Sequence, residues 1–232
     1  MSKPAVYLIP SLLHEDGISA ISPNVVEVVK KCQVFFVENE RSARRFLKKA
    51  WKEIVIDDYE WYKVSDTFQV SDTFKQKINE QKNIGIISDA GCPGIADPGQ
   101  LLVALAHEMN VVVKPLVGPS SILLALMGSG MNGQNFQFVG YLPVKDPERI
   151  KSIKELESVS QKKKSTQIFI ETPYRNNQLI DALFKNCRPS TRLCIAVDLT
   201  AGYEWIRTKT IGEWKKQIPD IHKRPAIFCL LA

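Results

Sequence analysis

The stretch Ser88-Asp89-Ala90-Gly91-Cys92-Pro93-Gly94-Ile95-Ala96-Asp97-Pro98-Gly99 decides the fold class. It follows the apolar run 83–87 and precedes a segment whose apolar residues recur at helical spacing. A loop rich in glycine and proline between a buried strand and a helix is a βα connection, and α/β folds bind ligands at the carboxyl ends of such strands. Small side chains would let a flat ligand approach the backbone. A long connection held by two turns explains the same residues, so a binding loop and a structural loop remain alternatives.

Apolar runs and helical patterns alternate along most of the chain, which predicts βαβ units and largely parallel sheets. Most runs are continuous rather than alternating, as in strands that are buried on both faces. Nine runs predict buried strands at 5–9, 33–37, 53–56, 83–87, 111–114, 136–139, 167–170, 193–197 and 226–231. A further, more polar strand is expected at 203–209, with an antiparallel neighbour.

Five prolines predict helix starts, because each follows a small or capping residue and proline's fixed φ suits the first helical position. They are Pro23, Pro98, Pro119, Pro147 and Pro173. Apolar residues recur at helical spacing after the first, second and last of these prolines. These starts complete the α/β pattern.

Length and composition exclude several classes of protein. The 232 residues are 44% hydrophobic and 24% charged, which excludes disorder, collagen and coiled coil as the main architecture. No apolar stretch reaches membrane-spanning length and no signal peptide precedes the first strand, so we expect a cytoplasmic protein without a membrane partner. Lysine and arginine exceed aspartate and glutamate by 31 to 25, and this +6 charge permits an anionic partner without requiring one.

Several cofactor and catalytic motifs do not occur in the sequence. No Gly-x-Gly-x-x-Gly follows the first strand, which argues against a nicotinamide enzyme and a Rossmann-type methyltransferase. There is no P-loop, no nucleophile elbow and no His-Glu-x-x-His. The five cysteines fit no zinc template, so we expect reduced, mostly buried thiols and no metal ion.

The sequence predicts two small α/β domains, 1–117 and 118–232, with the boundary at Val117-Gly118-Pro119. A boundary near Tyr141-Leu142-Pro143 is the alternative. The N-terminal sheet is expected to be mostly parallel and the C-terminal sheet mixed. The cleft between the two domains is the natural place for a ligand.

The stretch from Ile87 to Gly99 closely resembles the signature of the tetrapyrrole methylase superfamily, in the branch that methylates ribose 2′-hydroxyls of small-subunit ribosomal RNA. Cys92 stands where the family usually has threonine. Four further segments resemble family motifs in the same order along the chain: Glu38-Asn39-Glu40-Arg41, Val117-Gly118-Pro119-Ser120-Ser121, Glu171-Thr172-Pro173-Tyr174-Arg175 and Asp198-Leu199-Thr200. Five ordered matches in βα contexts are much stronger than one.

The resemblance implies an S-adenosylmethionine-dependent methyltransferase that folds its cofactor into the cleft between two α/β domains, usually in a homodimer. In the family, backbone and small residues hold the cofactor. By motif position the cofactor-binding residues here would be Pro10, Ser88, Asp89, Ala90, Gly91, Ile95, Ser120, Ser121, Glu171, Leu199, Thr200, Pro225 and Ala226.

Three departures from the family pattern concern the substrate. The family's RNA branch has a Gly-Asn-Leu loop after the first strand, and the loop 10–16 here has none. Tyr174 replaces a histidine, and Lys223-Arg224-Pro225 replaces Gly-Glu before the last strand. The resemblance to the RNA branch, together with the basic run 41–49, makes RNA the expected acceptor. The departures leave two alternatives: a small tetrapyrrole-like acceptor, or a degenerate protein that binds the cofactor without catalysis.

Methyl transfer from a sulfonium is an in-line displacement in which positioning supplies much of the rate and no metal is needed. A ribose hydroxyl would benefit from a general base, for which Glu38, Glu171 and Tyr174 are candidates. Arg41 and Arg175 could hold a phosphate or orient a carboxylate. An ordinary ion pair at a helix start explains Glu38 and Arg41 equally well.

Five cations lie within nine residues of one predicted helix: Arg41, Arg44, Arg45, Lys48 and Lys49. They could contact RNA phosphates, and a solvated helix face is the alternative. The aromatic cluster Tyr59, Trp61 and Tyr62 could stack on bases. Packing within the protein is the expected role for these rings.

Overall fold

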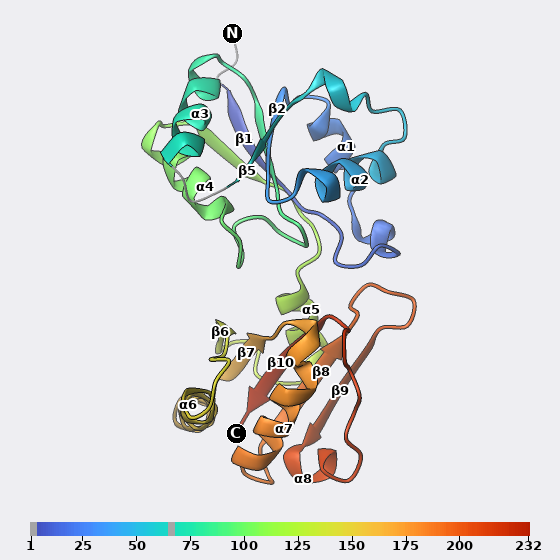
Figure 1. The fold of residues 1–232 in the computed structure, drawn as a ribbon, viewed down its shortest axis with the longest axis vertical. Coiled ribbons are helices and arrows are strands. Elements are labelled where there is room, and N and C mark those ends of the chain that lie inside the picture. The colour runs from blue at the N-terminus through green and yellow to red at the C-terminus, as the bar shows by residue number, and fades with distance from the viewer. Residues whose placement is uncertain (1–3, 65–67) are drawn as a thin grey trace. The chain divides into compact units, whose positions relative to one another are not determined.

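The structure is a computed structural model that describes residues 4–64 and 68–232 (Figure 1). The chain divides into two compact units, Met1–Ser120 and Ser121–Ala232. Each unit is built on its own five-stranded sheet. This is the expected pair of α/β domains.

The N-terminal unit holds a parallel sheet of order β3-β2-β4-β1-β5. Its strands are β1 (Ala5–Ile9), β2 (Val34–Val37), β3 (Glu60–Lys63), β4 (Ile84–Ile87) and β5 (Val112–Pro115). Its helices are η1 (Gly17–Ala20), α1 (Asn24–Val29), α2 (Glu40–Ala50), η2 (Ile56–Asp58), α3 (Phe68–Asn79) and α4 (Gly99–Glu108). Apolar residues of α1 and α2 cover one face of the sheet and those of α3 and α4 the other, which explains the continuous apolar runs.

The C-terminal unit holds a mixed sheet of order β6-β7-β10-β8-β9, in which only β6 and β7 are parallel neighbours. Its strands are β6 (Phe136–Tyr141), β7 (Thr166–Ile170), β8 (Arg192–Val197), β9 (Trp205–Thr210) and β10 (Ala226–Leu231). Its helices are α5 (Ser121–Ser129), α6 (Glu148–Lys163), η3 (Pro173–Arg175), α7 (Asn176–Asn186) and α8 (Ile211–Trp214). The parallel and mixed character expected for the two sheets is confirmed.

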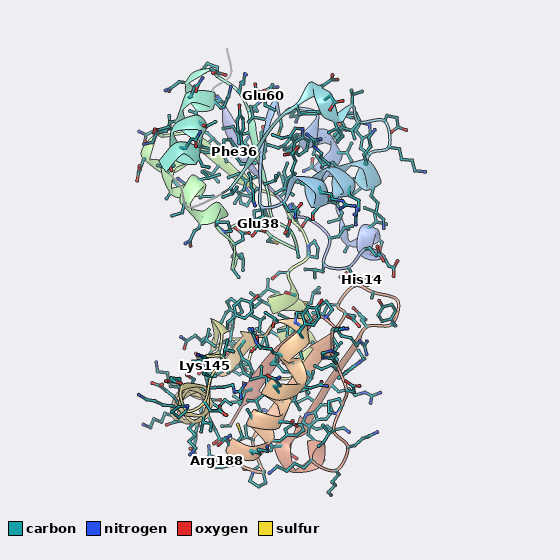
Figure 2. All side chains as sticks on the ribbon, viewed as in Figure 1. His14, Phe36, Glu38, Glu60, Lys145 and Arg188 are labelled. Atoms are coloured by element: carbon teal, nitrogen blue, oxygen red, sulfur yellow. The ribbon has the colours of Figure 1, made fainter. Side chains whose placement is uncertain are left out.

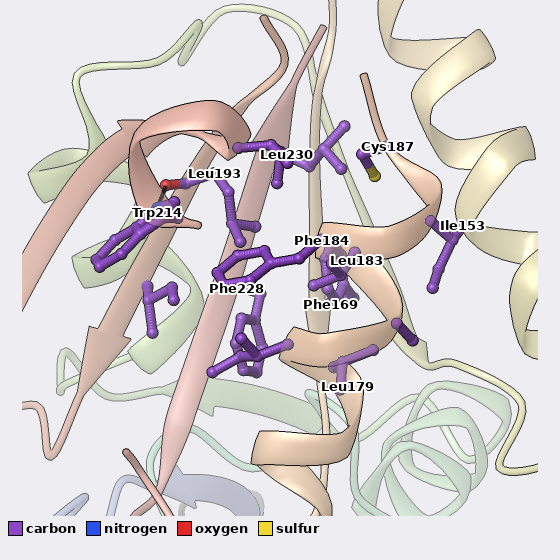
Figure 3. Close-up of a cluster of buried hydrophobic side chains, with 14 of the residues drawn as sticks. Ile153, Phe169, Leu179, Leu183, Phe184, Cys187, Leu193, Trp214, Phe228 and Leu230 are labelled. Atoms are coloured by element: carbon purple, nitrogen blue, oxygen red, sulfur yellow. Dashed lines mark hydrogen bonds between the residues drawn. The ribbon is translucent and has the colours of Figure 1, made fainter. Parts of the chain in front are cut away.

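The core of the C-terminal unit forms between the sheet and α6, α7 and α8 (Figure 3). The rings of Phe169 and Phe228 stack with centroids 5.6 Å apart. Trp214, the last residue of α8, is buried in this core, and its indole N–H donates to the Leu193 carbonyl at 2.8 Å. The helix α5 packs against β8, β9 and β10. The sheet edge that carries predicted site residues is thus anchored on a packed core.

One predicted strand is wrong. Residues 53–56 form no strand, and β3 lies later, at Glu60–Lys63. The reason is ring packing, because Trp61 stacks on Phe35 at 4.9 Å and Tyr62 stacks on Phe36 at 5.2 Å. These contacts confirm that the aromatic cluster packs within the protein.

The five proline signals are confirmed, since α1, α4, α5, α6 and η3 begin at the predicted proline or within two residues of it. The antiparallel strand expected at 203–209 is β9. All five cysteines are free thiols, four of them buried and Cys92 half-buried. Within the described ranges, no helix is both long enough and apolar enough to cross a bilayer.

Candidate functional site

Three loops meet where β1, β2 and β4 end, at the carboxyl edge of the parallel sheet. Ser11 follows β1, and its N–H donates to the Gly91 carbonyl at 2.9 Å. The Ser11 hydroxyl donates to the Ser88 carbonyl at 2.9 Å, and the Ser88 hydroxyl donates to the Gly91 carbonyl at 3.2 Å. Pro10 is buried beside Ser11. The structure therefore brings the predicted residues Pro10, Ser88 and Gly91 together through Ser11, which the sequence motifs missed.

Glu38 follows β2 and joins the same edge (Figure 2). Its Oε2 accepts the Asp89 N–H at 2.6 Å. Burial raises the pKa of Glu38, and the nearby charges of Asp97 and Asp89 add to the rise, while the hydrogen bond from Asp89 opposes it. Asp89 is exposed, and partial burial raises the pKa of its own carboxyl. A half-buried carboxyl with a raised pKa is suited to accept a proton.

Asp97 shapes the loop that follows. Its Oδ1 accepts the N–H of Gly94 at 2.9 Å and of Gly99 at 2.7 Å. Gly94 adopts a φ of +81°, a conformation that L-residues rarely adopt. Ala90 and Ile95 remain exposed on the loop. The loop is held by its own carboxylate, which leaves small and apolar side chains facing outward.

The turn after β5 packs directly on Pro10. A Cβ at position 118 would lie 2.2 Å from the Pro10 Cβ and 2.3 Å from its Cγ, so this position requires glycine. The Cys92 thiol donates to the Pro119 carbonyl at 3.4 Å, which ties the 88–99 loop to the turn. Ser120 and Ser121 follow and are half-buried.

A second group of predicted residues gathers where β7 and β8 end and β10 begins. Glu171 is 5% exposed, and its Oε1 accepts the Thr172 N–H at 2.7 Å and two guanidinium N–H groups of Arg175 at 3.0 and 2.6 Å. Its Oε2 is buried and has no hydrogen-bond partner among the described residues. Glu171 and Arg175 therefore form one unit, with one carboxylate oxygen left for a donor.

The loop after β8 is tied to the start of β10. Asp198 is 4% exposed, and its Oδ2 accepts from Arg224 Nε at 2.6 Å and Nη2 at 2.5 Å. The Asp198 N–H donates to the Pro225 carbonyl at 3.0 Å. Thr200 adopts a φ of +73°, which is strained for a β-branched residue, and its hydroxyl is buried without a partner in the described structure.

Of the other predicted residues in this group, Leu199 is buried and Ala226 pairs with Val197 in the sheet. Tyr174 is 68% exposed, with the Lys223 ammonium 5.9 Å from its ring centroid. Asp198 and Arg224 were not among the predicted site residues, although the Lys223-Arg224-Pro225 departure marked the place of the arginine.

The basic residues of α2 separate into different environments. Arg44 forms an ion pair with Glu40 and lies 5.2 Å from the Trp61 ring centroid. The ion pair at this helix start thus joins Glu40 and Arg44 rather than Glu38 and Arg41. The remaining cations are exposed and are Arg41, Arg45, Lys48 and Lys49.

The residues present fit S-adenosylmethionine, which offers amino, hydroxyl, carboxylate and adenine groups. The unpartnered buried oxygens of Glu171 and Thr200 can satisfy such polar groups, because buried polar atoms are rarely left unpaired. In the N-terminal unit, the exposed loop residues Ala90 and Ile95 offer small and apolar contacts. Among residues 4–64 and 68–232, no group of three or more His, Cys, Asp or Glu side chains is arranged to hold a metal ion.

Comparisons with known proteins give one family. The family described as Tetrapyrrole (Corrin/Porphyrin) Methylases matches residues 17–214. The Ribosomal RNA small subunit methyltransferase I of Vibrio cholerae is 27% identical over 213 residues, covering 90% of this chain and 70% of the relative. The protein of the same name from Escherichia coli O157:H7 is 32% identical over 152 residues, covering 64% and 52%. The one from Buchnera aphidicola is 27% identical, covering 97% and 77%.

Solved structures agree on the architecture. The methyltransferase CobJ superposes with a TM-score of 0.64 at 13% identity, covering 99% of this chain and 94% of CobJ. The cobalt precorrin-4 methyltransferase CbiF gives a TM-score of 0.61 at 13% identity, covering 98% and 94%. At these identities the likeness shows the fold.

Proposed function

Because the chain belongs to the tetrapyrrole methylase family and is an S-adenosylmethionine-dependent methyltransferase, we propose that its methyl acceptor is RNA, at a ribose 2′-hydroxyl. The observation that carries the proposal is the similarity along most of the chain to relatives named Ribosomal RNA small subunit methyltransferase I. The exposed cations of α2 support it, since RNA phosphates need such partners. The cytoplasm, where ribosomal RNA is found, is the proposed compartment.

The methyl donor supplies an activated methyl group on a sulfonium, so the protein's own task is to position the acceptor and remove its proton. We propose Glu38 as the general base. Its raised pKa makes it a stronger base than an ordinary carboxylate, and its bond to the Asp89 N–H holds it in place. Arg41, exposed one residue into α2, is proposed to orient an RNA phosphate.

The second group of residues is proposed to serve the cofactor. Arg175 is paired with Glu171 Oε1, and Oε2, which has no partner among the described residues, is suited to accept a hydrogen bond from the cofactor. Tyr174 is proposed to contact the acceptor, because its ring is exposed beside Lys223. The remaining cofactor contacts are proposed at the motif positions named in the sequence.

We propose that the protein is a homodimer. Large apolar side chains are exposed on and beside the edge strand β5 of the N-terminal unit, among them Leu101, Val112 and Val117, and Val117 is 87% exposed. Such side chains on an edge strand and its flanks are suited to a protein interface. Light scattering tests this assembly, and a monomeric mass at micromolar concentration would refute it.

Transfer of a labelled methyl group tests the acceptor. The protein is incubated with labelled S-adenosylmethionine and either total RNA or a small-molecule extract, and the label is counted in each fraction. Label in RNA is the expected result. Label only in the small-molecule fraction would overturn the RNA proposal in favour of a tetrapyrrole-like acceptor. Calorimetric binding of the cofactor without any transfer would identify a protein that has lost catalysis.

Two variants of Glu38 separate proton removal from loop positioning. Glu38→Gln keeps an oxygen that can accept the Asp89 N–H but loses the base, whereas Glu38→Ala loses both. General bases contribute about 100- to 10,000-fold, so Glu38→Gln should lower kcat by at least about 100-fold and abolish the rise of rate with pH. A rate for Glu38→Gln near that of the wild type would refute the role of Glu38.

A further inference from the structure

A pocket of about 270 Å³ lies in the N-terminal unit beside the carboxyl edge of the parallel sheet. Its walls come from the loop after β1, from α2 and from the first residues after β4. It is therefore bounded by the loop that departs most from the family pattern and by the helix that carries the basic run.

The five cations of α2 differ in whether they line the pocket. Arg45 and Lys49 line it, whereas Arg41, Arg44 and Lys48 do not. These two residues are four apart and so lie on one face of the helix. Arg45 makes no hydrogen bond or ion pair with any described residue, and Lys49 donates to the backbone carbonyl of Glu15. One wall of the pocket thus presents two neighbouring positive charges, one of them without a partner in the described structure.

The rest of the lining suits a sugar and a base rather than a second anion. Leu12, Leu13 and Phe46 supply apolar surface. Ser42 supplies a hydroxyl on the helix side. Glu15 and Asp89 also line the pocket, and their carboxylates repel a further phosphate while they can accept hydrogen bonds from ribose hydroxyls. The lining thus offers cations for one phosphate, and carboxylates and apolar surface for a nucleoside.

We propose that this pocket binds a single nucleotide of the RNA acceptor, with the phosphate held by Arg45 and Lys49 and the nucleoside against Leu12 and Leu13. The inference rests on the proposed RNA function and assigns the phosphate of this one nucleotide to Arg45 and Lys49, whereas Arg41 lies outside the pocket. The volume of about 270 Å³ lies just below the range of about 300–1,000 Å³ that is typical of small-ligand pockets, so the pocket suits one nucleotide at most and is small for a tetrapyrrole macrocycle. Bound there, the nucleotide lies next to Asp89, whose backbone is bonded to Glu38.

Binding of a short, fluorescently labelled single-stranded RNA tests the proposal, measured by anisotropy at several salt concentrations. Charge-assisted hydrogen bonds to phosphate predict that Arg45→Ala and Lys49→Ala each weaken binding about tenfold. The variant with both substitutions loses one phosphate contact, so its binding should depend less on salt. The slope of log K against log salt should become smaller in magnitude by about 0.7. Lys52→Ala is the matched control, since Lys52 is exposed just after α2 and outside the pocket. It should change binding less than twofold.

A variant without a charge change addresses the pocket itself. Ser42→Trp places a large side chain in the pocket from the exposed side of α2 and should weaken RNA binding as much as Arg45→Ala does. An unchanged affinity for Ser42→Trp would overturn the proposal, with circular dichroism used to verify folding. Equal losses in Lys48→Ala and Arg45→Ala would also overturn it, because a diffuse basic helix would then account for binding.

Cofactor titration by calorimetry separates this inference from the proposed function. If the wild-type protein binds S-adenosylmethionine but no RNA, the RNA function fails and the pocket assignment fails with it. If the wild-type protein binds RNA and the pocket variants bind it equally well, only the pocket assignment fails. If the pocket variants lose labelling of a small molecule instead of RNA, the occupant is a small anion and the nucleotide assignment is wrong.

Discussion

Substitution of Gly118 by alanine tests the packing on which the N-terminal site depends. The new Cβ would lie 2.2 Å from the Pro10 Cβ and 2.3 Å from its Cγ, far inside van der Waals contact. Pro10 is a buried, rigid ring, so no flexible side-chain end can move aside. Overpacking typically costs about 1–3 kcal/mol, and this geometry places Gly118→Ala at about 2–3 kcal/mol.

Urea unfolding followed by circular dichroism measures the loss. With a slope of about 2 kcal/mol per molar urea, the midpoint should fall by about 1–1.5 M. Gly133→Ala is the control, because a Cβ there meets no atom within 4 Å. It should change the free energy of unfolding by less than about 0.5 kcal/mol.

A double-mutant cycle identifies the cause. Pro10→Gly removes both atoms that the new methyl group meets, so Gly118→Ala should cost at least about 1 kcal/mol less in that background. Cofactor affinity should also fall in Gly118→Ala, since Pro10 precedes Ser11 and its bonds to the 88–91 loop. A loss in Gly118→Ala no larger than that in Gly133→Ala, or no relief from Pro10→Gly, would refute the reasoning.

Three other substitutions test particular contacts. Asn39→Ala removes the side chain that accepts the first N–H groups of α2, and thermal melting should show a loss of about 1 kcal/mol. The hydrogen bond from the Lys77 ammonium is the main cause that holds the pKa of Glu60 at about 2, below its usual 4.5. The ion pair therefore stabilises the fold fully above pH 4.5, and this stabilisation is lost as the pH falls towards 2. Stability should therefore fall less steeply over that range in Glu60→Gln, and parallel pH profiles would contradict this. Arg224→Met leaves the buried Asp198 carboxylate without its cation and should lower the free energy of unfolding in urea by about 2–3 kcal/mol. Most of that loss should be recovered when Asp198→Asn is added. A loss below about 0.5 kcal/mol in Arg224→Met would contradict the pairing.

The strand predicted at 53–56 was wrong because apolar pattern alone did not locate β3, which lies at Glu60–Lys63. Three of the four residues 53–56 are apolar, but only Ile54 is buried. The later residues Trp61 and Tyr62 form the strand because their rings stack on Phe35 and Phe36 of β2. Ring contacts between strands join residues that are far apart in the chain, so they cannot be predicted from the propensities of neighbouring residues.

The loops of the candidate site were predicted, but the contacts within them were not, for the same reason. Loops at strand ends were found, because each motif follows an apolar run that becomes a strand. The partners inside those loops were not, since Ser11 reaches Ser88 across 77 residues and Asp198 reaches Arg224 across 26. Whether a charged helix residue faces a pocket also depended on helix orientation, which separates Arg45 and Lys49 from Arg44.

By itself, the sequence determined the α/β class, the positions of most strands and helix starts, and the loops that carry the family's motifs. These features follow from local periodicity, proline geometry and short motifs, which are properties of neighbouring residues. Tertiary structure alone decided that Pro10 requires glycine at position 118, that Glu38 bonds the backbone of Asp89, and that two of five cations line a pocket. Each of these depends on distances between segments brought together by sheet order, and sheet order is a property of the whole fold.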